Sequence, residues 1–353
     1  MTVLAPAPPA APASSPRWRG VRTGAWAVVL VVALAVSIVV SVTLGPAELS
    51  ADDVWGTILA HLGLGESALS PLRDGIVWEL RMPRVLAAAA VGAGLALCGA
   101  IMQAVLRNPL ADPYLLGLSS GASFGAVTVI VLGFTVALPI AAFAGALAAL
   151  VATLALAGAV GRITSSRTIL AGIAVSAVLG ALTSLVIFWS ATGDSYREIL
   201  SWLLGSLAGV TWPTAVIALV AIAVIGLPLL ASAGALDAFA FGDRAAASLG
   251  IAVGRTRWVL LGATALLTGC LVAVSGSIGF IGLVVPHAVR LLVGARHRAL
   301  LPLSLLTGAI FLVWADTLAR TLFDPRELPV GVVTALIGAP LFAVLLLRSR
   351  RIS

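Results

Sequence analysis

The sequence predicts an all-α polytopic membrane protein with about ten transmembrane helices, and three observations support this fold class. Of the 353 residues, 61% are hydrophobic and only 10% are charged, whereas a soluble domain carries roughly a quarter charged residues. The mean hydropathy is +1.14. Apolar segments long enough to cross a bilayer as helices, about 20 residues each, recur along almost the whole chain.

The N-terminal segment differs from the rest of the chain. Residues 1–16 are rich in Pro, Ala and Ser and carry no charged side chain, so we expect a disordered tail there and a transmembrane domain at 17–353. Three arginines (Arg17, Arg19 and Arg22) then precede an apolar segment that continues to about Leu44. That segment is too long for the core of a signal peptide and is interpreted as a signal anchor that stays in the membrane.

Hydropathy divides the chain into ten expected spans. They cover 23–44, 84–106, 115–135, 137–160, 168–191, 209–231, 257–275, 278–294, 300–322 and 328–347. An even number places both termini on one side of the membrane. With both termini in the cytoplasm, fifteen of the 21 arginines lie on the inner side and six on the outer side. This bias favours that orientation of a multi-pass plasma-membrane protein, because positive charge collects on the cytoplasmic side.

The outer loop between the first two spans, about 45–83, contains an amphipathic piece at Ala51–Leu64 and ends in an unusual pair, Arg81 and Arg84. Arginines on the outer side go against the charge bias. An acidic docking partner would explain them, because guanidinium groups bind carboxylates with two parallel hydrogen bonds. The alternative is that both side chains extend towards lipid headgroups.

The inner loop at about 232–256 contains a predicted short helix, Asp243–Leu249, that Gly250 ends. This helix is too short and too polar to span the membrane. A short cytoplasmic helix between two spans would suit contact with a soluble motor protein, and a simple connecting loop is the alternative.

Small residues recur every fourth position in the fifth span, at Gly172, Ser176, Gly180 and Ser184. Such a pattern lets helix backbones approach closely. Close packing within the subunit explains it, and the alternative is that this face lines a pathway or a subunit interface.

Several kinds of chemistry are disfavoured. The chain contains no lysine, so it cannot carry the phosphate-binding lysine of a Walker A loop. Cys98 and Cys270 lie in apolar segments outside any C-x-x-C pair, and no two histidines share a helical face, so we expect no metal site and no catalytic residue. The spans also lack the buried Asp, Glu or His chain that an ion-coupled secondary carrier uses, or a cluster of such residues expected of a membrane enzyme.

Short strings along the chain resemble the permease subunits of the FecCD family, which serve bacterial ABC importers for iron–siderophore complexes, haem and cobalamin. The resemblance covers about 75–347, nearly the whole chain. The strings are RMPRVL (81–86), GAIMQ (99–103), RNPLADP (107–113), LGLSSG (116–121), WLLGSL (202–207), GFIGLVVPH (279–287), RHR (296–298) and ELPVGVVTALIGAP (327–340).

The resemblance implies a type II ABC importer permease in a bacterial plasma membrane. It implies a pair formed with a second copy or a homologue, two cytoplasmic ATPase subunits that use ATP and Mg, and an extracytoplasmic substrate-binding protein. It implies no cofactor on this chain and no nucleic-acid partner. A ferric siderophore is the expected cargo, with haem and cobalamin as alternatives and an ion-coupled secondary transporter as the competing mechanism. The choice between homodimer and heterodimer stays open.

Site residues are also implied by the resemblance. It assigns docking of the binding protein to Arg81, Arg84 and Arg320, with Arg326 as a further member. Coupling to the ATPase falls to the segment 237–252, with Asp237, Gly242, Asp243, Ala246, Leu249 and Gly250. The translocation pathway falls to the fifth span, whose small-residue face is Gly172, Ser176, Gly180 and Ser184.

Overall fold

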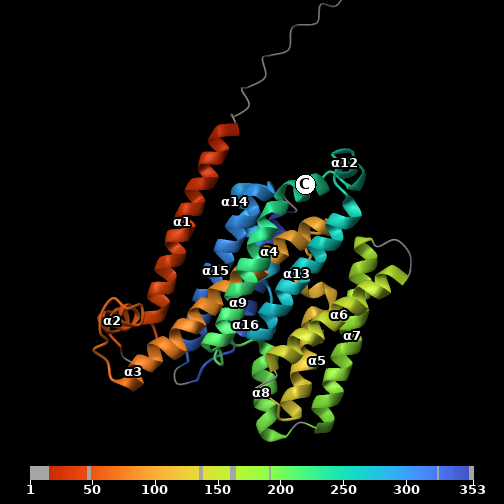
Figure 1. The fold of residues 1–353 in the computed structure, drawn as a ribbon. Coiled ribbons are helices and arrows are strands. Elements are labelled where there is room, and N and C mark those ends of the chain that lie inside the picture. Colours follow the sequence, from red (N-terminus) through yellow and green to blue (C-terminus); the bar gives the residue numbers. More distant parts are fainter. Residues whose placement is uncertain are drawn as a thin grey trace, which may run out of the picture.

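The computed structural model describes residues 16–45, 49–134, 138–159, 164–190, 192–323 and 326–349, and the regular structure in these ranges is helical (Figure 1). Apart from Pro16, where the first helix begins, the predicted disordered tail lies outside the described residues. The elements are α1 (Pro16–Thr43), α2 (Ala51–His61), α3 (Pro71–Gly75), η1 (Ile76–Arg81), α4 (Met82–Val105), η2 (Pro113–Leu116), α5 (Leu118–Val131), α6 (Leu138–Ala159), α7 (Ser165–Ser190), α8 (Gly193–Leu204), α9 (Trp212–Ala221), η4 (Ile222–Gly226), α10 (Leu227–Leu229), η5 (Leu230–Ser232), α11 (Ala233–Phe239), α12 (Asp243–Ser248), α13 (Val253–Ser275), α14 (Ile281–Val293), α15 (His297–Thr321) and α16 (Val330–Ser349).

The ten predicted spans correspond to ten apolar helical segments in the described ranges. Seven of these are long enough to cross a membrane by themselves, and three are shorter: Leu118–Val131, Ile281–Val293 and Val330–Leu345. The span predicted at 115–135 begins later than expected because η2 occupies its first residues and Gly117 then turns the chain with a φ of 80°. Only glycine adopts such a left-handed conformation without a steric penalty.

Three segments differ from the hydropathy division. One of them is α8, a helix that was not predicted and that lies between the fifth and sixth spans. A capping box formed by Thr192 and Ser195 begins α8, and its residue Ile199 is fully buried. The second span extends back without interruption through η1 and α3 to Pro71, and the sixth extends forward to Phe239. In both cases the helix continues beyond the apolar segment. Hydropathy does not detect this continuation, because the added residues are less apolar. The amphipathic piece of the outer loop is confirmed as α2, which Ser50 caps.

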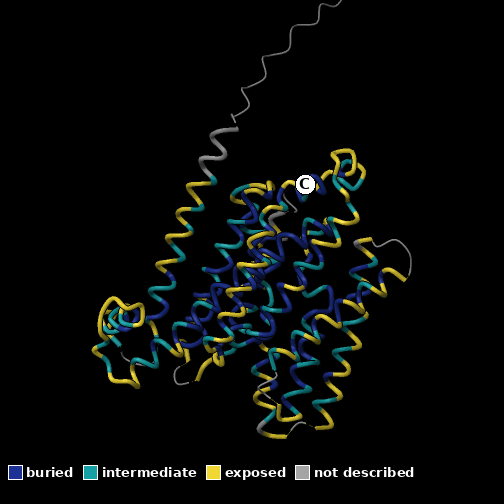
Figure 2. Tube along the Cα trace, viewed as in Figure 1, coloured by how far each residue is buried: buried dark blue, intermediate teal, exposed yellow. Residues whose placement is uncertain are grey.

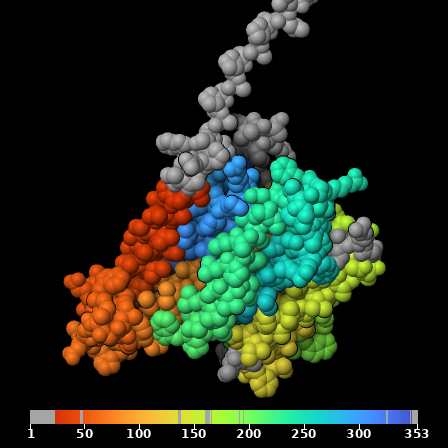
Figure 3. All heavy atoms as spheres, turned by 45° about the horizontal axis from the view of Figure 1, so that its top comes forward, coloured from red at the N-terminus to blue at the C-terminus, as the bar shows by residue number. Residues whose placement is uncertain are grey.

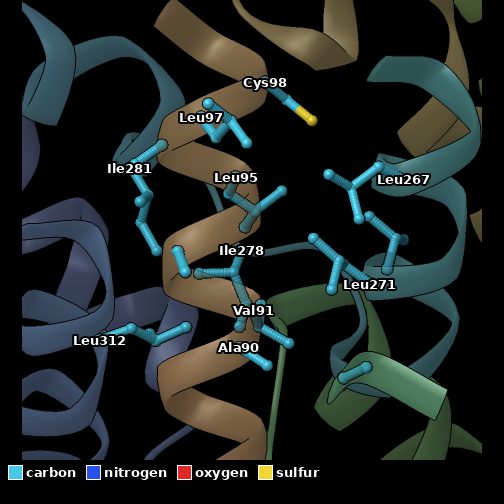
Figure 4. Close-up of a cluster of buried hydrophobic side chains, with 14 of the residues drawn as sticks. Ala90, Val91, Leu95, Leu97, Cys98, Leu267, Leu271, Ile278, Ile281 and Leu312 are labelled. Atoms are coloured by element: carbon cyan, nitrogen blue, oxygen red, sulfur yellow. The ribbon is translucent and has the colours of Figure 1, made fainter. Parts of the chain in front are cut away.

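α4 is the central helix of the bundle, and it is buried along almost all of its length. It lies between α13 on one side and α14 and α15 on the other (Figure 4). Leu95 and Leu97 of α4 and Leu271 of α13 are almost fully buried in this core. Because α4 is surrounded by protein, its sequence is apolar on every face and shows no amphipathic stripe.

Two glycines allow α4 to pack this closely. A Cβ atom added at Gly92 would lie 2.2 Å from the carbonyl oxygen of Gly308 in α15. One added at Gly99 would lie 1.9 Å from the carbonyl oxygen of Gly282 in α14. Small residues at helix crossings let backbones touch, which is a main source of stability where lipid removes the hydrophobic driving force.

Two helices are largely exposed. Only 17% of the most apolar window in α1, and the same share in α7, is buried inside the subunit (Figure 2). The exposed residues of α7 are large and apolar, among them Leu170, Val178, Phe188 and Trp189. A face of this kind must be covered by lipid or by another subunit.

The bundle has two distinct ends. The start of α1, the end of α16 and α12 lie at one end, whereas α2, α3 and α8 lie at the opposite end (Figure 1). This arrangement agrees with an even number of crossings. By the arginine bias, the end with α12 is expected to face the cytoplasm, and it is called the inner end below.

Candidate functional site

At the outer end, Arg84 in the first turns of α4 is held inside the protein. Its Nε donates to both carboxylate oxygens of Asp316 in α15, at 3.1 and 2.9 Å, and its Nη2 donates to Asp316 Oδ1 at 3.0 Å. Its Nη1 donates to Glu327 Oε2 at 2.7 Å. The Asp316 side chain is 1% exposed and that of Glu327 is 38% exposed. One guanidinium therefore joins α4, α15 and the segment before α16 in a charge-assisted network.

Arg81 and Arg320 both reach the C-terminal end of α1. Arg81 Nη1 donates to the carbonyl oxygens of Val42 and Thr43, each at 3.0 Å. Arg320 Nη2 donates to the carbonyl oxygen of Ser41 and, at 2.9 Å, to its hydroxyl oxygen. The last carbonyls of a helix lack intrahelical partners and carry a partial negative charge, so cations there are stabilising. The two arginines thus act as side-chain caps that hold α1 against the bundle.

This geometry corrects one part of the sequence interpretation. We expected three guanidinium groups facing the exterior, yet Arg81, Arg84 and Arg320 are 5%, 8% and 4% exposed. They turn inward because Asp316, Glu327 and the end of α1 supply acceptors there. Arg326, the fourth predicted docking residue, is exposed at this end. A direct contact with carboxylates of a partner is open to Arg326 in this conformation, and docking stays a prediction.

At the inner end the predicted short helix is present as α12, which begins at Asp243 and is followed by Gly250 with a φ of 83°. Gly242, with a φ of 96°, turns the chain between α11 and α12. Ala246, in the middle of α12, is fully buried, whereas Leu249 and Phe241 are 69% and 79% exposed. α12 therefore presents an apolar tip at this end of the molecule while Ala246 fixes its base.

Asp243 ties α12 to two spans. Its Oδ1 accepts a hydrogen bond from Arg257 Nη2 of α13 at 2.9 Å and lies 3.4 Å from Arg107 Nη2, just after α4. Arg107 has a φ of 49°, a left-handed conformation that a residue other than glycine adopts at an energetic cost. The constraint places its side chain beside α12, so a displacement of α12 would be felt by both α4 and α13.

Asp237, the other acidic residue predicted for coupling, lies on α11 and holds the start of α15 instead. It accepts hydrogen bonds from the backbone N–H of His297 at 2.9 Å and from the His297 ring at 2.7 Å. An acceptor at this position satisfies an unpaired donor of the helix N-terminus. Asp237 is therefore brought near the coupling segment but contributes a capping contact inside the subunit.

The predicted pathway face of α7 divides in two. Gly172 is buried, and a Cβ atom there would lie 1.9 Å from the carbonyl oxygen of Leu115 in η2. Ser176 lies near Gly117. Gly180 has no atom within 4 Å of its added Cβ, and Ser184 is exposed. Close packing thus explains the first half of the pattern, and only Gly180 and Ser184 are open to a pathway or partner.

The sequence interpretation missed the partners of these arginines. Asp316 was the one acidic residue within a predicted span, and an acid placed in a membrane helix predicts a buried cation partner. Arg107 and Arg257 gave no comparable signal, because both lie among other inner arginines. In the described ranges no three His, Cys, Asp or Glu side chains gather where they could hold a metal ion.

Comparisons with known proteins agree with this architecture. The model of the FecCD transport family matches residues 33–348. An uncharacterized ABC transporter permease, YvrB of Bacillus subtilis, is 43% identical over 90% of this chain and 92% of its own length. The cobalamin import permease BtuC of Halobacterium salinarum is 40% identical over 94% of this chain and 98% of its own length.

A solved structure also resembles the bundle. It is described as an inward-facing conformation of an ABC transporter assigned to the metal-chelate type by proposal, and it superposes with a TM-score of 0.79 at 33% identity, covering 91% of this chain and 98% of that one.

Proposed function

This chain belongs to the FecCD transport family as a membrane-spanning permease subunit of an ABC importer, and we propose that it carries a metal chelate from an extracytoplasmic binding protein into the cytoplasm. Energy comes from separate ATPase subunits that bind ATP and Mg, since a chain without lysine has no Walker A lysine of its own. The subunit does no chemistry itself and converts movement at its inner end into a change of pathway access.

The observation that carries this proposal is the attachment of α12. The helix combines an exposed apolar tip with a base tied through Asp243 to α13 and to the end of α4. Such a tip suits a shallow apolar cleft on a soluble partner. Closure of the ATPase pair then pushes α12, and the paired arginines pass the displacement to α4, the helix on which most of the bundle packs.

The pathway is proposed to form between two such subunits. The exposed apolar face of α7, with Gly180 and Ser184 at its open half, supplies the area that a second copy or a homologue would cover. Gly172 and Ser176 pack α7 against η2 and the residue after it. We therefore expect α7 to move together with η2. In this proposal Gly180 and Ser184 line the pathway, whereas Gly172 and Ser176 position α7.

Two cargo candidates have support of different kinds. The 40% identical relative is named for cobalamin import, and the solved structure at 33% identity is described as metal-chelate type. We therefore place cobalamin beside ferric siderophore, the cargo that the family resemblance favours, with haem as the third member. All three are metal chelates too large for a narrow ion pore, which fits a cavity between two subunits.

Docking of the binding protein is proposed at the outer end, with exposed Arg326 as the first guanidinium met by partner carboxylates. Charges at the rim of an interface mainly set the encounter rate and its salt dependence. Arg326→Glu is expected to slow association with the binding protein severalfold, measured by surface plasmon resonance on nanodisc-embedded complex. Arg73 on α3 is also an exposed outer arginine, so Arg73→Glu is the matched control, and equal effects of both variants would remove Arg326 from the docking site.

Transport by the assembled importer tests the function as a whole. Proteoliposomes containing permease and ATPase subunits are supplied with binding protein loaded with cobalamin, a ferric siderophore or haem. We expect uptake of one chelate that requires ATP inside the vesicle. Uptake that continues without the ATPase subunits would identify an ion-coupled carrier and overturn the proposal, and failure of the binding protein to bind any metal chelate would overturn the cargo class.

A further inference from the structure

A pocket of about 670 Å³ lies at the inner end, where α12, the start of α13, Leu154 of α6 and Thr164, just before α7, line it. In Figure 3, where this end comes forward, the teal residues of α12 and α13 lie beside the yellow-green residues of α6 and α7. The volume is in the range of small-ligand sites. Three arginines line it, Arg107, Arg244 and Arg257, and the lining contains one carboxylate, that of Asp243.

The positive charge of this pocket exceeds what its own carboxylate can neutralise. Asp243 accepts from Arg257 at 2.9 Å and is 3.4 Å from Arg107, and Arg244 is exposed and makes no ion pair within the described part of the chain. The Nε of Arg257 is buried without a hydrogen-bond acceptor among the described residues. A buried donor without an acceptor is costly, so Arg257 retains donor capacity for an additional oxygen ligand.

The walls of the pocket change from polar to apolar with depth. Arg244 and Asp243 belong to α12, outside the spans, and Arg257 and Trp258 lie in the second turn of α13. Leu261 lies one turn further along α13 and is 1% exposed, and Leu154 of α6 also lines the pocket. This order matches a membrane interface, where headgroups meet acyl chains and tryptophan is enriched.

From these features we infer that the pocket is a binding site for a phosphate group, presented by the headgroup of an anionic phospholipid whose acyl chains lie against Leu154 and Leu261. Guanidinium groups match phosphate oxygens in geometry and charge. Basic pockets between spans on the cytoplasmic side are suited to such headgroups. A lipid held here would touch both α12 and α13, and it would stabilise the attachment on which movement of α12 depends.

Trp258 provides a local readout, since its side chain lines the pocket and is 45% exposed. The full chain is placed in nanodiscs, and quenching by brominated phosphatidylglycerol is compared with quenching by brominated phosphatidylcholine. The contribution of Trp258 is the difference between the wild type and Trp258→Phe. We expect phosphatidylglycerol to quench this component at a clearly lower mole fraction than phosphatidylcholine.

Arginine variants assign that preference to the pocket. Arg244→Gln and Arg257→Gln are each expected to lower it about fivefold, the factor that corresponds to ~1 kcal/mol per arginine near a membrane surface. Arg244 is exposed, so its variant stays informative if Arg257→Gln fails to fold. Arg298→Gln is the matched control, because Arg298 is an exposed arginine at the same end that lies outside the pocket lining.

Excess inorganic phosphate distinguishes the two sources of the ligand. If phosphate leaves the preference unchanged, the lipid headgroup is the ligand. If phosphate alone alters the Trp258 emission and removes the preference for phosphatidylglycerol, the site takes dissolved phosphate. Equal quenching by the two lipids without any response to phosphate, or an equal loss in Arg298→Gln, would overturn the inference. None of these readouts involves transport, so they are independent of the proposed function.

Discussion

Removing one partner of the pair formed by Arg84 and Asp316 is expected to cost more stability than breaking any other ion pair described in this chain. Asp316 is 1% exposed and accepts from two nitrogens of Arg84. Removing one partner of a buried ion pair costs about 3–5 kcal/mol, because the other charge is left without compensation. In Asp316→Asn the contact of Arg84 with Glu327 at 2.7 Å persists, so the lower limit applies, about 3 kcal/mol.

Glu327→Gln provides the internal comparison. The side chain of Glu327 is 38% exposed, and solvent-exposed ion pairs contribute about 1 kcal/mol or less. Arg84 also keeps its three hydrogen bonds to Asp316 in this variant. We therefore expect Asp316→Asn to lower the melting temperature clearly more than Glu327→Gln does. The double variant Arg84→Met/Asp316→Leu should recover most of the loss, because apolar residues of similar volume replace buried pairs at little cost.

Thermal unfolding in detergent can be followed with a thiol-reactive dye that reacts with the two native cysteines, so no further cysteine has to be introduced. Cys98 is fully buried in the core and Cys270 is half-buried, so both thiols react when the bundle opens. The expected order of melting temperatures is wild type, then Glu327→Gln, with Asp316→Asn lowest. A melting temperature of Asp316→Asn at or above that of Glu327→Gln would refute the reasoning from burial.

Three further predictions concern packing, coupling and pH. Gly99→Val should prevent folding of the bundle, because even a Cβ atom at Gly99 would lie 1.9 Å from the carbonyl oxygen of Gly282; expression with normal thermostability would contradict this. Asp243→Asn should lower cargo uptake severalfold while the ATPase still assembles, measured by co-purification and transport, and unchanged uptake would remove Asp243 from coupling. Burial raises the pKa of Asp112 to about 6, so ionisation of Asp112 lowers the stability of the fold as pH rises from about 4 to 7. Asp112→Asn should therefore have a higher melting temperature than wild type at pH 7 but not at pH 4.

Much of the fold could be predicted from local properties of the sequence. Hydropathy located ten apolar segments because the bilayer requires a minimum length of apolar helix regardless of what surrounds it. α12 was predicted as a short helix because Asp243 and Gly250 supply start and stop signals within a few residues of each other. Its attachment could not be predicted, since Arg107 and Arg257 reach Asp243 from other parts of the chain.

The sequence by itself determined that this protein is a helical membrane bundle without a Walker A lysine, because length, hydropathy and the absence of lysine are properties that folding does not change. Only the tertiary structure decided which of its charged side chains are buried in contacts within the subunit and which are exposed to a partner. Arg84 and Asp316 are 232 residues apart, and their side chains meet only because α4 and α15 pack at Gly92 and Gly308. The physical reason is that a guanidinium buried among protein atoms must have acceptors beside it, and those acceptors come from helices that no local pattern connects.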